Sequence, residues 1–354
     1  MKHIKPLRLV SLLAALSLLL AGCAYNPENV LTIDGEVVPA GRWLYYQMVA
    51  LSDATAVASD ETGETLSETA VLDYTVEGLD AREWIRAETE ALCKRHIFIE
   101  REFERLGLEF TEEELASFES SALSAWDYYA GDYYEANGIG YESFLAVYTN
   151  SMMESEVRST LFAEDGEMAI SAEEKQDYFN ENFAYVEYIR LPDSDSAGFN
   201  MLANYTDEFV AIADSMLARA QESDLTTAYL ELYGEVLELA QDTETVVSEE
   251  NASSVVLNAT MSEALGYSEE LCSAALACEP GGYTSAESGG TLYILHRTAM
   301  PEEENAETYD SYILDALSSE PFESYIEEAT AAYELEADER AAAYYSPDKI
   351  YLPY

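Results

Sequence analysis

A periodic pattern between Arg82 and Leu106 limits the fold of this chain more than any other segment does. Mostly apolar side chains recur there at alternating steps of four and three residues, a spacing that places them along one face of an α-helix. This face comprises Ile85, Thr89, Leu92, His96, Ile99, Phe103 and Leu106. Gly107 can end the helix, and Thr111 with Glu114 has the spacing of a capping box. We therefore predict a long amphipathic helix that is followed closely by a second one.

Further helices are expected downstream of this pair. Apolar periodicity indicates one helix at about 141–162 and another at about 171–181. The second of these starts at another capping box, formed by Ser171 and Glu174. The region 78–182 is therefore predicted to be entirely helical.

The segment before the long helix begins with a β-hairpin pattern. Between Val30 and Val38, β-branched residues flank Asp34-Gly35, a pair that readily adopts the positive φ angles of a tight turn. Pro39 would end the second strand, and a helix is expected at 42–51. The acidic, Ser- and Thr-rich stretch 52–77 has weak periodicity, so we predict a loop there.

The second half of the chain changes from helical to mixed patterns. A strand, a helix-rich stretch, a polar linker, a short helix, a turn and a second strand are expected in that order. The first strand is expected at Tyr185–Leu191, the helix-rich stretch at Asp207–Ala240 and the polar linker after residue 240. The short helix is expected at about 268–278, the turn at Pro280–Gly282 and the second strand at Thr291–Arg297, and a last helix follows at about 307–341. The predicted fold class is therefore α+β and mostly α.

The chain is strongly acidic, with 17 Lys and Arg against 70 Asp and Glu and a formal net charge of −53. Such a field repels nucleic acid and anionic lipid, so neither is expected as a partner. A solvated surface that maintains solubility is one use of this charge, and calcium binding is another. However, the sequence contains no Asp-x-Asp-x-Asp-Gly loop with a trailing Glu.

The first 23 residues have the pattern of an export signal. Basic residues precede an apolar run, Leu9–Leu20, that is too short to span a bilayer stably. The run ends in Leu20-Ala-Gly-Cys23, which resembles the bacterial lipobox, whose cysteine is lipidated after cleavage. We therefore expect Cys23 to carry a lipid and the remaining chain to work outside the cytoplasm, anchored to the bacterial cell membrane. An ordinary secretory signal that happens to contain a cysteine is the alternative.

Cysteine and histidine are scarce after the signal. Cys93, Cys272 and Cys278 are an odd number, and the last two would point away from each other on one helix, so no disulfide framework is expected. His96 lies on the buried face of the long helix and is predicted to be a core residue. His296 is predicted to be structural or at the surface. Isolated histidines do not suggest a zinc site, and neither a metal nor a cofactor is predicted.

Several stretches, taken in order, resemble one known family. They are Val30–Pro39, Ile99–Glu114, Ser171–Phe183, Ser268–Tyr283 and Gly290–His296. Their order resembles that of the extracytoplasmic parvulin-type foldases, the PrsA and SurA group of peptidyl-prolyl isomerases and chaperones. The resemblance implies a signal at 1–23, a helical chaperone domain at 24–182, a divergent parvulin-like domain at 183–300, and a C-terminal helix within 301–354 that completes the chaperone domain.

The same resemblance places Tyr188 and Leu292 where family members have their two active-site histidines. The family's Gly-Gly-Asp-Leu-Gly stretch is also replaced, here by residues 251–257. Prolyl isomerisation crosses a barrier of about 20 kcal/mol, and a shaped, hydrogen-bonded pocket lowers it. Without the paired imidazoles, we expect isomerase activity to be weak or lost.

Two groups of residues are candidates for binding unfolded polypeptides. One is aromatic, because tyrosine offers a large contact area and a hydroxyl at a low entropic cost. The other consists of basic residues on the long helix, which could bind acidic client segments or could instead pair with neighbouring acids. The candidates are Trp126, Tyr128, Tyr129, Tyr133, Tyr134, Arg101 and Arg105.

The predicted function is that of a membrane-anchored chaperone that assists the folding of secreted proteins. Its partners would be unfolded or nascent secreted polypeptides. Two alternatives remain open. The chain could be an active peptidyl-prolyl isomerase with a rearranged pocket in which Tyr188 donates a hydrogen bond, or a lipoprotein that binds one dedicated partner.

Overall fold

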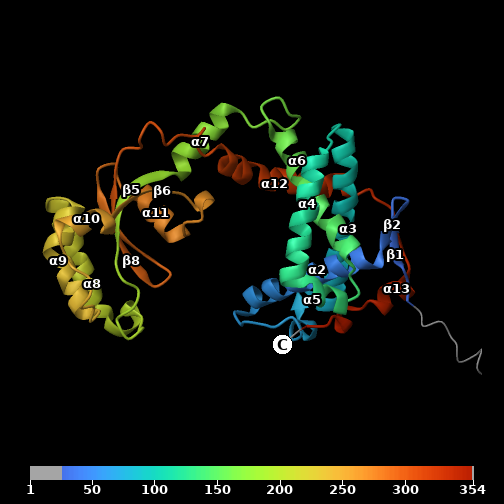
Figure 1. Ribbon diagram of the computed structural model, residues 1–354, viewed down its shortest axis with the longest axis horizontal. Helices are drawn as coiled ribbons and strands as arrows, with labels where there is room; N and C mark the ends of the chain where they lie inside the picture. The colour runs from blue at the N-terminus through green and yellow to red at the C-terminus, as the bar shows by residue number, and fades with distance from the viewer. Residues whose placement is uncertain (1–25, 353–354) are drawn as a thin grey trace, which may run out of the picture. The chain divides into compact units, whose positions relative to one another are not determined.

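The computed structural model describes residues 26–352, which form mostly helices together with small antiparallel sheets (Figure 1). The predicted fold class, α+β and mostly α, is confirmed. The chain divides into two compact units. The first unit contains the residues up to Thr160 together with Glu323–Tyr354, and the second contains Leu161–Phe322. The segment 183–300 lies within the second unit.

The first unit combines an N-terminal sheet with several helices. Its elements are β1 (Asn29–Ile33), β2 (Glu36–Pro39), α2 (Ala40–Thr62), β3 (Thr75–Val76), β4 (Leu79–Asp80), α3 (Ala81–Arg105), α4 (Glu112–Ala125), a turn of π-helix (Trp126–Ala130), α5 (Gly131–Ala136), most of α6 (Tyr141–Phe162), the end of α12 (Asp310–Thr330), β9 (Leu335–Ala337) and α13 (Glu339–Tyr344).

The N-terminal hairpin is confirmed. Asp34 and Gly35 have φ angles of 50° and 86°, and Ile33 pairs with Glu36 across this two-residue turn. A third strand was not predicted. β9 pairs with the free edge of β1, with Leu31 opposite Ala337. The C-terminal segment thus completes a three-stranded sheet that begins at the N-terminus.

The prediction of one last helix over 307–341 is wrong at its C-terminal end. α12 ends at Thr330, and the chain then forms β9 before α13 begins. The side chain of Asp338 caps α13 by accepting hydrogen bonds from the backbone of Arg340 and Ala341. The strand forms because β1 offers unpaired backbone groups, a tertiary influence that overrides the local helical preference.

α2 runs to Thr62, so much of the loop predicted at 52–77 is helical. Three small residues at steps of four, Ala50, Ala54 and Ala58, are fully buried and pack in one core cluster with residues of α3. The Ser and Thr hydroxyls of this stretch donate to carbonyls one turn earlier, as Thr55 does to Leu51 at 2.7 Å. A stripe of alanines gives little apolar periodicity, which explains the error.

α3 is the long amphipathic helix that the sequence predicts. Its buried residues include Ile85, Thr89, His96, Ile99 and Phe103. The His96 ring is fully buried, with Nδ1 2.8 Å from the Tyr46 hydroxyl and Nε2 3.1 Å from the Glu100 carboxylate. Burial lowers the pKa of His96. The ring is therefore neutral at pH 7, as expected of a core histidine.

The arginines of α3 hold distant parts of the chain against this helix. Arg82 binds Asp348 at 2.6 Å and Arg86 binds Glu339 at 2.8 Å, both near the C-terminus. Arg95 binds Glu154 of α6 at 2.7 Å. These charged hydrogen bonds lie at several points along α3, and they fix the C-terminal segment and α6 against this helix.

The second unit is built around a four-stranded antiparallel sheet with the strand order β6-β5-β8-β7. Its elements are α7 (Ala172–Asn182), β5 (Ala184–Arg190), α8 (Met201–Glu222), α9 (Leu225–Leu239), α10 (Glu249–Val255), β6 (Val256–Met261), α11 (Glu269–Ala277), β7 (Tyr283–Ser288), β8 (Thr291–Arg297) and the first part of α12.

The strands β5 and β8 are confirmed, whereas β6, β7 and α10 were not predicted. β6 and α10 occupy the predicted polar linker. β7 is an edge strand with the sequence Tyr-Thr-Ser-Ala-Glu-Ser and little apolar character. It forms because Gly289 and Gly290, with φ angles of 58° and 76°, turn the chain back onto β8.

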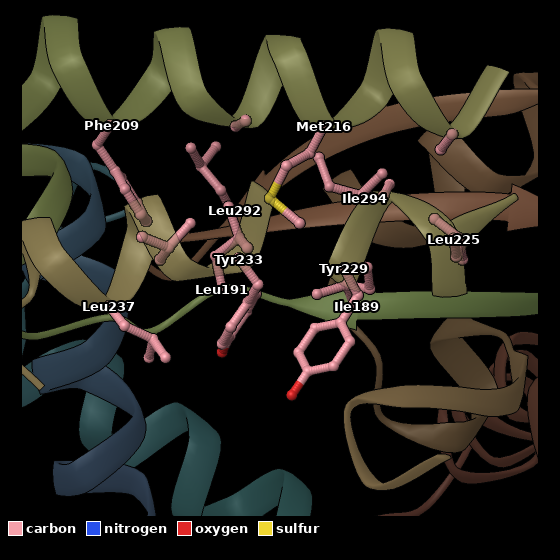
Figure 2. Packing of buried hydrophobic residues seen from close by; sticks show 14 of the residues in the cluster. Ile189, Leu191, Phe209, Met216, Leu225, Tyr229, Tyr233, Leu237, Leu292 and Ile294 are labelled. Carbon is pink, nitrogen blue, oxygen red and sulfur yellow. The ribbon is translucent and has the colours of Figure 1, made fainter. Parts of the chain in front are cut away.

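The two faces of this sheet are covered by different helices. α8 and α9 pack on one face, where Phe209 and Met216 of α8 point toward Leu292 and Ile294 of β8 (Figure 2). α11 packs on the other face through Leu271 and neighbouring side chains. We refer to these as the α8/α9 face and the α11 face.

Candidate functional site

Three tyrosines gather on the α11 face of the sheet. Tyr188 lies in β5 and Tyr293 in β8, with ring centroids 6.1 Å apart and planes at 45°. Tyr267 lies just before α11, and all three rings pack against the apolar cluster beneath α11. Each is half-buried, so one side of the group faces solvent. We call Tyr188, Tyr267 and Tyr293 the tyrosine group.

Tyr188 offers a hydrogen-bond donor rather than an acid–base catalyst. Burial raises the pKa of the Tyr188 hydroxyl, and the neighbouring Tyr267 and Tyr293 raise it further. The hydroxyl therefore keeps its proton at neutral pH. The histidines of the described chain, His96 and His296, both lie elsewhere, so this group presents aromatic surface and O–H donors without an imidazole.

The two sequence-predicted parvulin positions lie on opposite faces of the sheet. Leu292 is buried on the α8/α9 face (Figure 2), whereas Tyr188 lies on the α11 face. Side chains alternate along a strand, so the neighbouring residue Tyr293 shares the face of Tyr188. The structure therefore brings Tyr188 together with Tyr293 and not with Leu292. The alternation of side chains along β5 and β8 shows which residues share a face, but only once the register between the two strands is known.

His296 lies on the opposite face from the tyrosine group. Its Nδ1 is 2.9 Å from Glu187 Oε2 across the β5–β8 pair. Its ring stacks on Tyr283 of β7, with centroids 4.2 Å apart and planes at 6°. These contacts agree with the structural role predicted for this histidine.

The aromatic candidates of the first unit form a cluster around Trp126. This side chain is buried and stacks on Tyr134 at a centroid distance of 5.9 Å. Tyr134 also stacks on the half-buried Tyr133, at 5.9 Å, and contacts Phe144. A Cβ at Gly131 would approach Trp126 to 2.8 Å, so the π-helical turn needs glycine there. Trp126 and Tyr134 therefore contribute mainly to core packing.

Tyr128 differs from these residues because its side chain is 79% exposed. It borders a hollow of about 760 Å³ that runs along the end of α4 and is lined by Ser120, Ser121, Ser124, Ala125, Asp127 and Tyr128. α4 also exposes Leu115 and Leu123. We call Leu115, Leu123 and Tyr128 the α4 surface. The side chain of Tyr129, the remaining aromatic candidate, lies outside the described part of the structure.

The two basic candidates are engaged within the first unit. Arg101 binds Asp34 and Glu36, both at 2.7 Å, and so holds the turn of the N-terminal hairpin. Arg105 binds the buried carboxylate of Glu102 at 2.6 Å. These contacts favour the structural alternative for both arginines over binding of acidic clients.

Other features bear on the remaining sequence predictions. Cys93, Cys272 and Cys278 are free thiols. Within residues 26–352, no cluster of three His, Cys, Asp or Glu side chains is arranged to hold a metal. No helix in that range is long and apolar enough to cross a bilayer. Cys23 lies outside the described residues.

The chain is similar to several solved foldase structures. Foldase protein PrsA from Streptococcus pneumoniae matches at 15% identity and a TM-score of 0.36, over 82% of this chain and 86% of that one. PrsA from Lactococcus lactis matches at 10% identity and a TM-score of 0.35, over 90% of this chain and 98% of that one. A SurA-like chaperone from Campylobacter jejuni matches at 11% identity and a TM-score of 0.27, over 88% of this chain and 100% of that one. No protein-family model and no curated protein matches the chain.

Proposed function

We propose that this protein is a lipid-anchored, extracytoplasmic holding chaperone for unfolded secreted polypeptides, with weak or no prolyl isomerase activity. In this proposal, residues 24–182 and 301–354 form the chaperone domain and 183–300 form a divergent parvulin-like domain. Cys23 carries the lipid that keeps the protein where secreted chains emerge.

The observation that carries the proposal is the α4 surface. Exposed apolar side chains that lie close together often mark interaction sites. Leu115 and Leu123 are exposed on α4, and the exposed Tyr128, just after this helix, also lines an open hollow. Such a surface can bind apolar segments of varied sequence. The net charge of −53 would keep the complexes apart, because like-charged particles repel each other.

The tyrosine group supports the loss of strong isomerase activity. Catalysis of prolyl rotation requires donors and acceptors arranged around the twisted amide. Of the two positions where the resemblance implies imidazoles, Tyr188 is a phenol on the α11 face and Leu292 is a buried leucine on the α8/α9 face. Aromatic rings that carry hydroxyl groups remain well suited to hold a peptide segment. The second domain would then add client surface rather than catalysis.

An active isomerase remains the second candidate, because the protonated hydroxyl of Tyr188 can donate a hydrogen bond. Refolding of a substrate protein limited by a slow prolyl phase separates the two functions. We expect the wild-type chain to leave the rate of that phase unchanged, within about twofold, since rotation is slow without a catalyst. Acceleration that disappears in both Tyr188→Phe and Tyr293→Phe, but not in Tyr283→Phe on the other face, would establish the isomerase instead.

A further inference from the structure

The second unit contains a hollow of about 740 Å³ that the proposed function has not used. It lies between α7, the turn that precedes it and α12. Its apolar floor includes Phe162, Ile170, Tyr178 and Leu317. Pockets of this size accommodate ligands as large as a few side chains. We call it the α7–α12 hollow.

The rim of this hollow is acidic. Glu174, Asp177 and Glu181 line it from α7 at steps of three and four residues, and Glu167 lines it from the preceding turn. Like charges at these helical spacings repel each other and destabilise a helix. None of the described residues that line the hollow is Lys, Arg or His. The rim therefore concentrates negative charge beside an apolar surface.

The basic residue of α7 does not compensate this charge from within the hollow. Lys175 forms an ion pair with Asp310 at 2.7 Å and lines a different hollow together with it. Glu174 is held in place by the capping box, because its carboxylate accepts hydrogen bonds from the backbone and hydroxyl of Ser171 at 2.8 and 2.7 Å. The acidic rim is thus partly fixed before any ligand arrives.

α12 contributes a further side of the hollow. Pro321 lies inside α12 and lines the hollow, as does Leu317 four residues earlier. The hollow therefore combines apolar lining residues with carboxylates, of which that of Glu174 is held by the capping box.

We propose that the α7–α12 hollow binds a cationic side chain, Lys or Arg, together with an adjacent large apolar side chain of an extended polypeptide. The cation would meet the carboxylates of the rim, and the apolar side chain would cover Tyr178 and Leu317. This inference rests on the proposed function, since it names a class of client segment. In this proposal the second unit prefers client segments that are both basic and apolar, whereas the α4 surface of the first unit binds apolar segments.

The test uses the whole chain after the predicted signal segment and a short fluorescent peptide in which Leu and Lys alternate. Asp177→Asn with Glu181→Gln removes two rim charges without touching the capping box. Exposed ionic contacts each contribute modestly, so we expect about fivefold weaker binding, measured by fluorescence anisotropy. Higher salt should weaken wild-type binding more than that of the variant.

The matched control, Asp207→Asn with Glu208→Gln, removes the same charge from exposed positions of α8 in the same unit. Its peptide affinity should stay within about twofold of the wild type, because the long-range field alone changes little. Equal weakening by both pairs, or equal wild-type binding of a matched Leu–Glu peptide, would overturn the inference. Wild-type failure to suppress aggregation would instead reject the proposed chaperone function, so the two failures are distinguishable.

Discussion

Replacing Phe209 with Ala is expected to lower the free energy of unfolding of the second unit by about 3–5 kcal/mol. Phe209 is fully buried on α8 and points into the cluster on the α8/α9 face, near Leu292 (Figure 2). The interior packs closely, and truncation leaves a cavity that the surrounding helices and sheet can only partly fill. A loss of this size is a large share of the stability of most domains.

Urea unfolding followed by circular dichroism measures this effect. Phe199→Ala is a matched control, because it removes the same side chain from a position that is 59% exposed in the same unit. Its effect should stay within about 0.5 kcal/mol. If the two substitutions destabilise the protein equally, then the α8/α9 face is not the core of this unit.

Replacing Cys23 with Ala is expected to move the protein from the membrane fraction to the soluble fraction. A lipid on Cys23 would supply the apolar surface for anchoring, at about 0.8 kcal/mol per buried CH₂. The acidic remainder of the chain has no electrostatic attraction to anionic lipid. Cell fractionation and detection of the protein in each fraction measure the shift.

An uncleaved signal segment could hold the Cys23→Ala protein at the membrane, so a second version is needed. In it, residues 1–23 are replaced by a cleavable secretory signal without a cysteine. Both versions should fold like the wild type, as checked by circular dichroism. Membrane association of the second version would contradict the lipid anchor.

The parts of the fold that could be predicted from sequence are those encoded by neighbouring residues. Asp34-Gly35 sets the turn of the N-terminal hairpin, and the pairs Thr111 with Glu114 and Ser171 with Glu174 set the starts of α4 and α7. Both capping boxes form as predicted. Likewise, the periodicity of α3 and the alternation in β5 and β8 are local patterns that survive in the structure.

The errors involve segments whose structure depends on a distant partner. β9 forms on the open edge of β1, and β7 on the edge of β8, although neither sequence favours a strand strongly. The extension of α2 depends on burying small alanines such as Ala54 and Ala58 in a cluster shared with α3. Such packing leaves little trace in a single sequence.

The candidate site shows the same limit. Tyr188 could be singled out from the resemblance, but its neighbour on the α11 face is Tyr293 rather than Leu292. A shift of one residue along a strand moves a side chain to the other face of the sheet. The aromatic candidates around Trp126 could be predicted as a group, yet only the structure distinguishes the buried Trp126 from the exposed Tyr128.

Aggregation of a chemically denatured protein after dilution, followed by light scattering, tests the holding function most directly. An equally acidic folded protein without an exposed aromatic surface controls for charge alone. The wild-type chain at an equimolar ratio should lower the scattering severalfold, without any nucleotide, while the acidic control leaves it unchanged. Unchanged scattering with several unrelated substrates, together with saturable capture of one partner, would contradict the chaperone function and favour a dedicated binding protein.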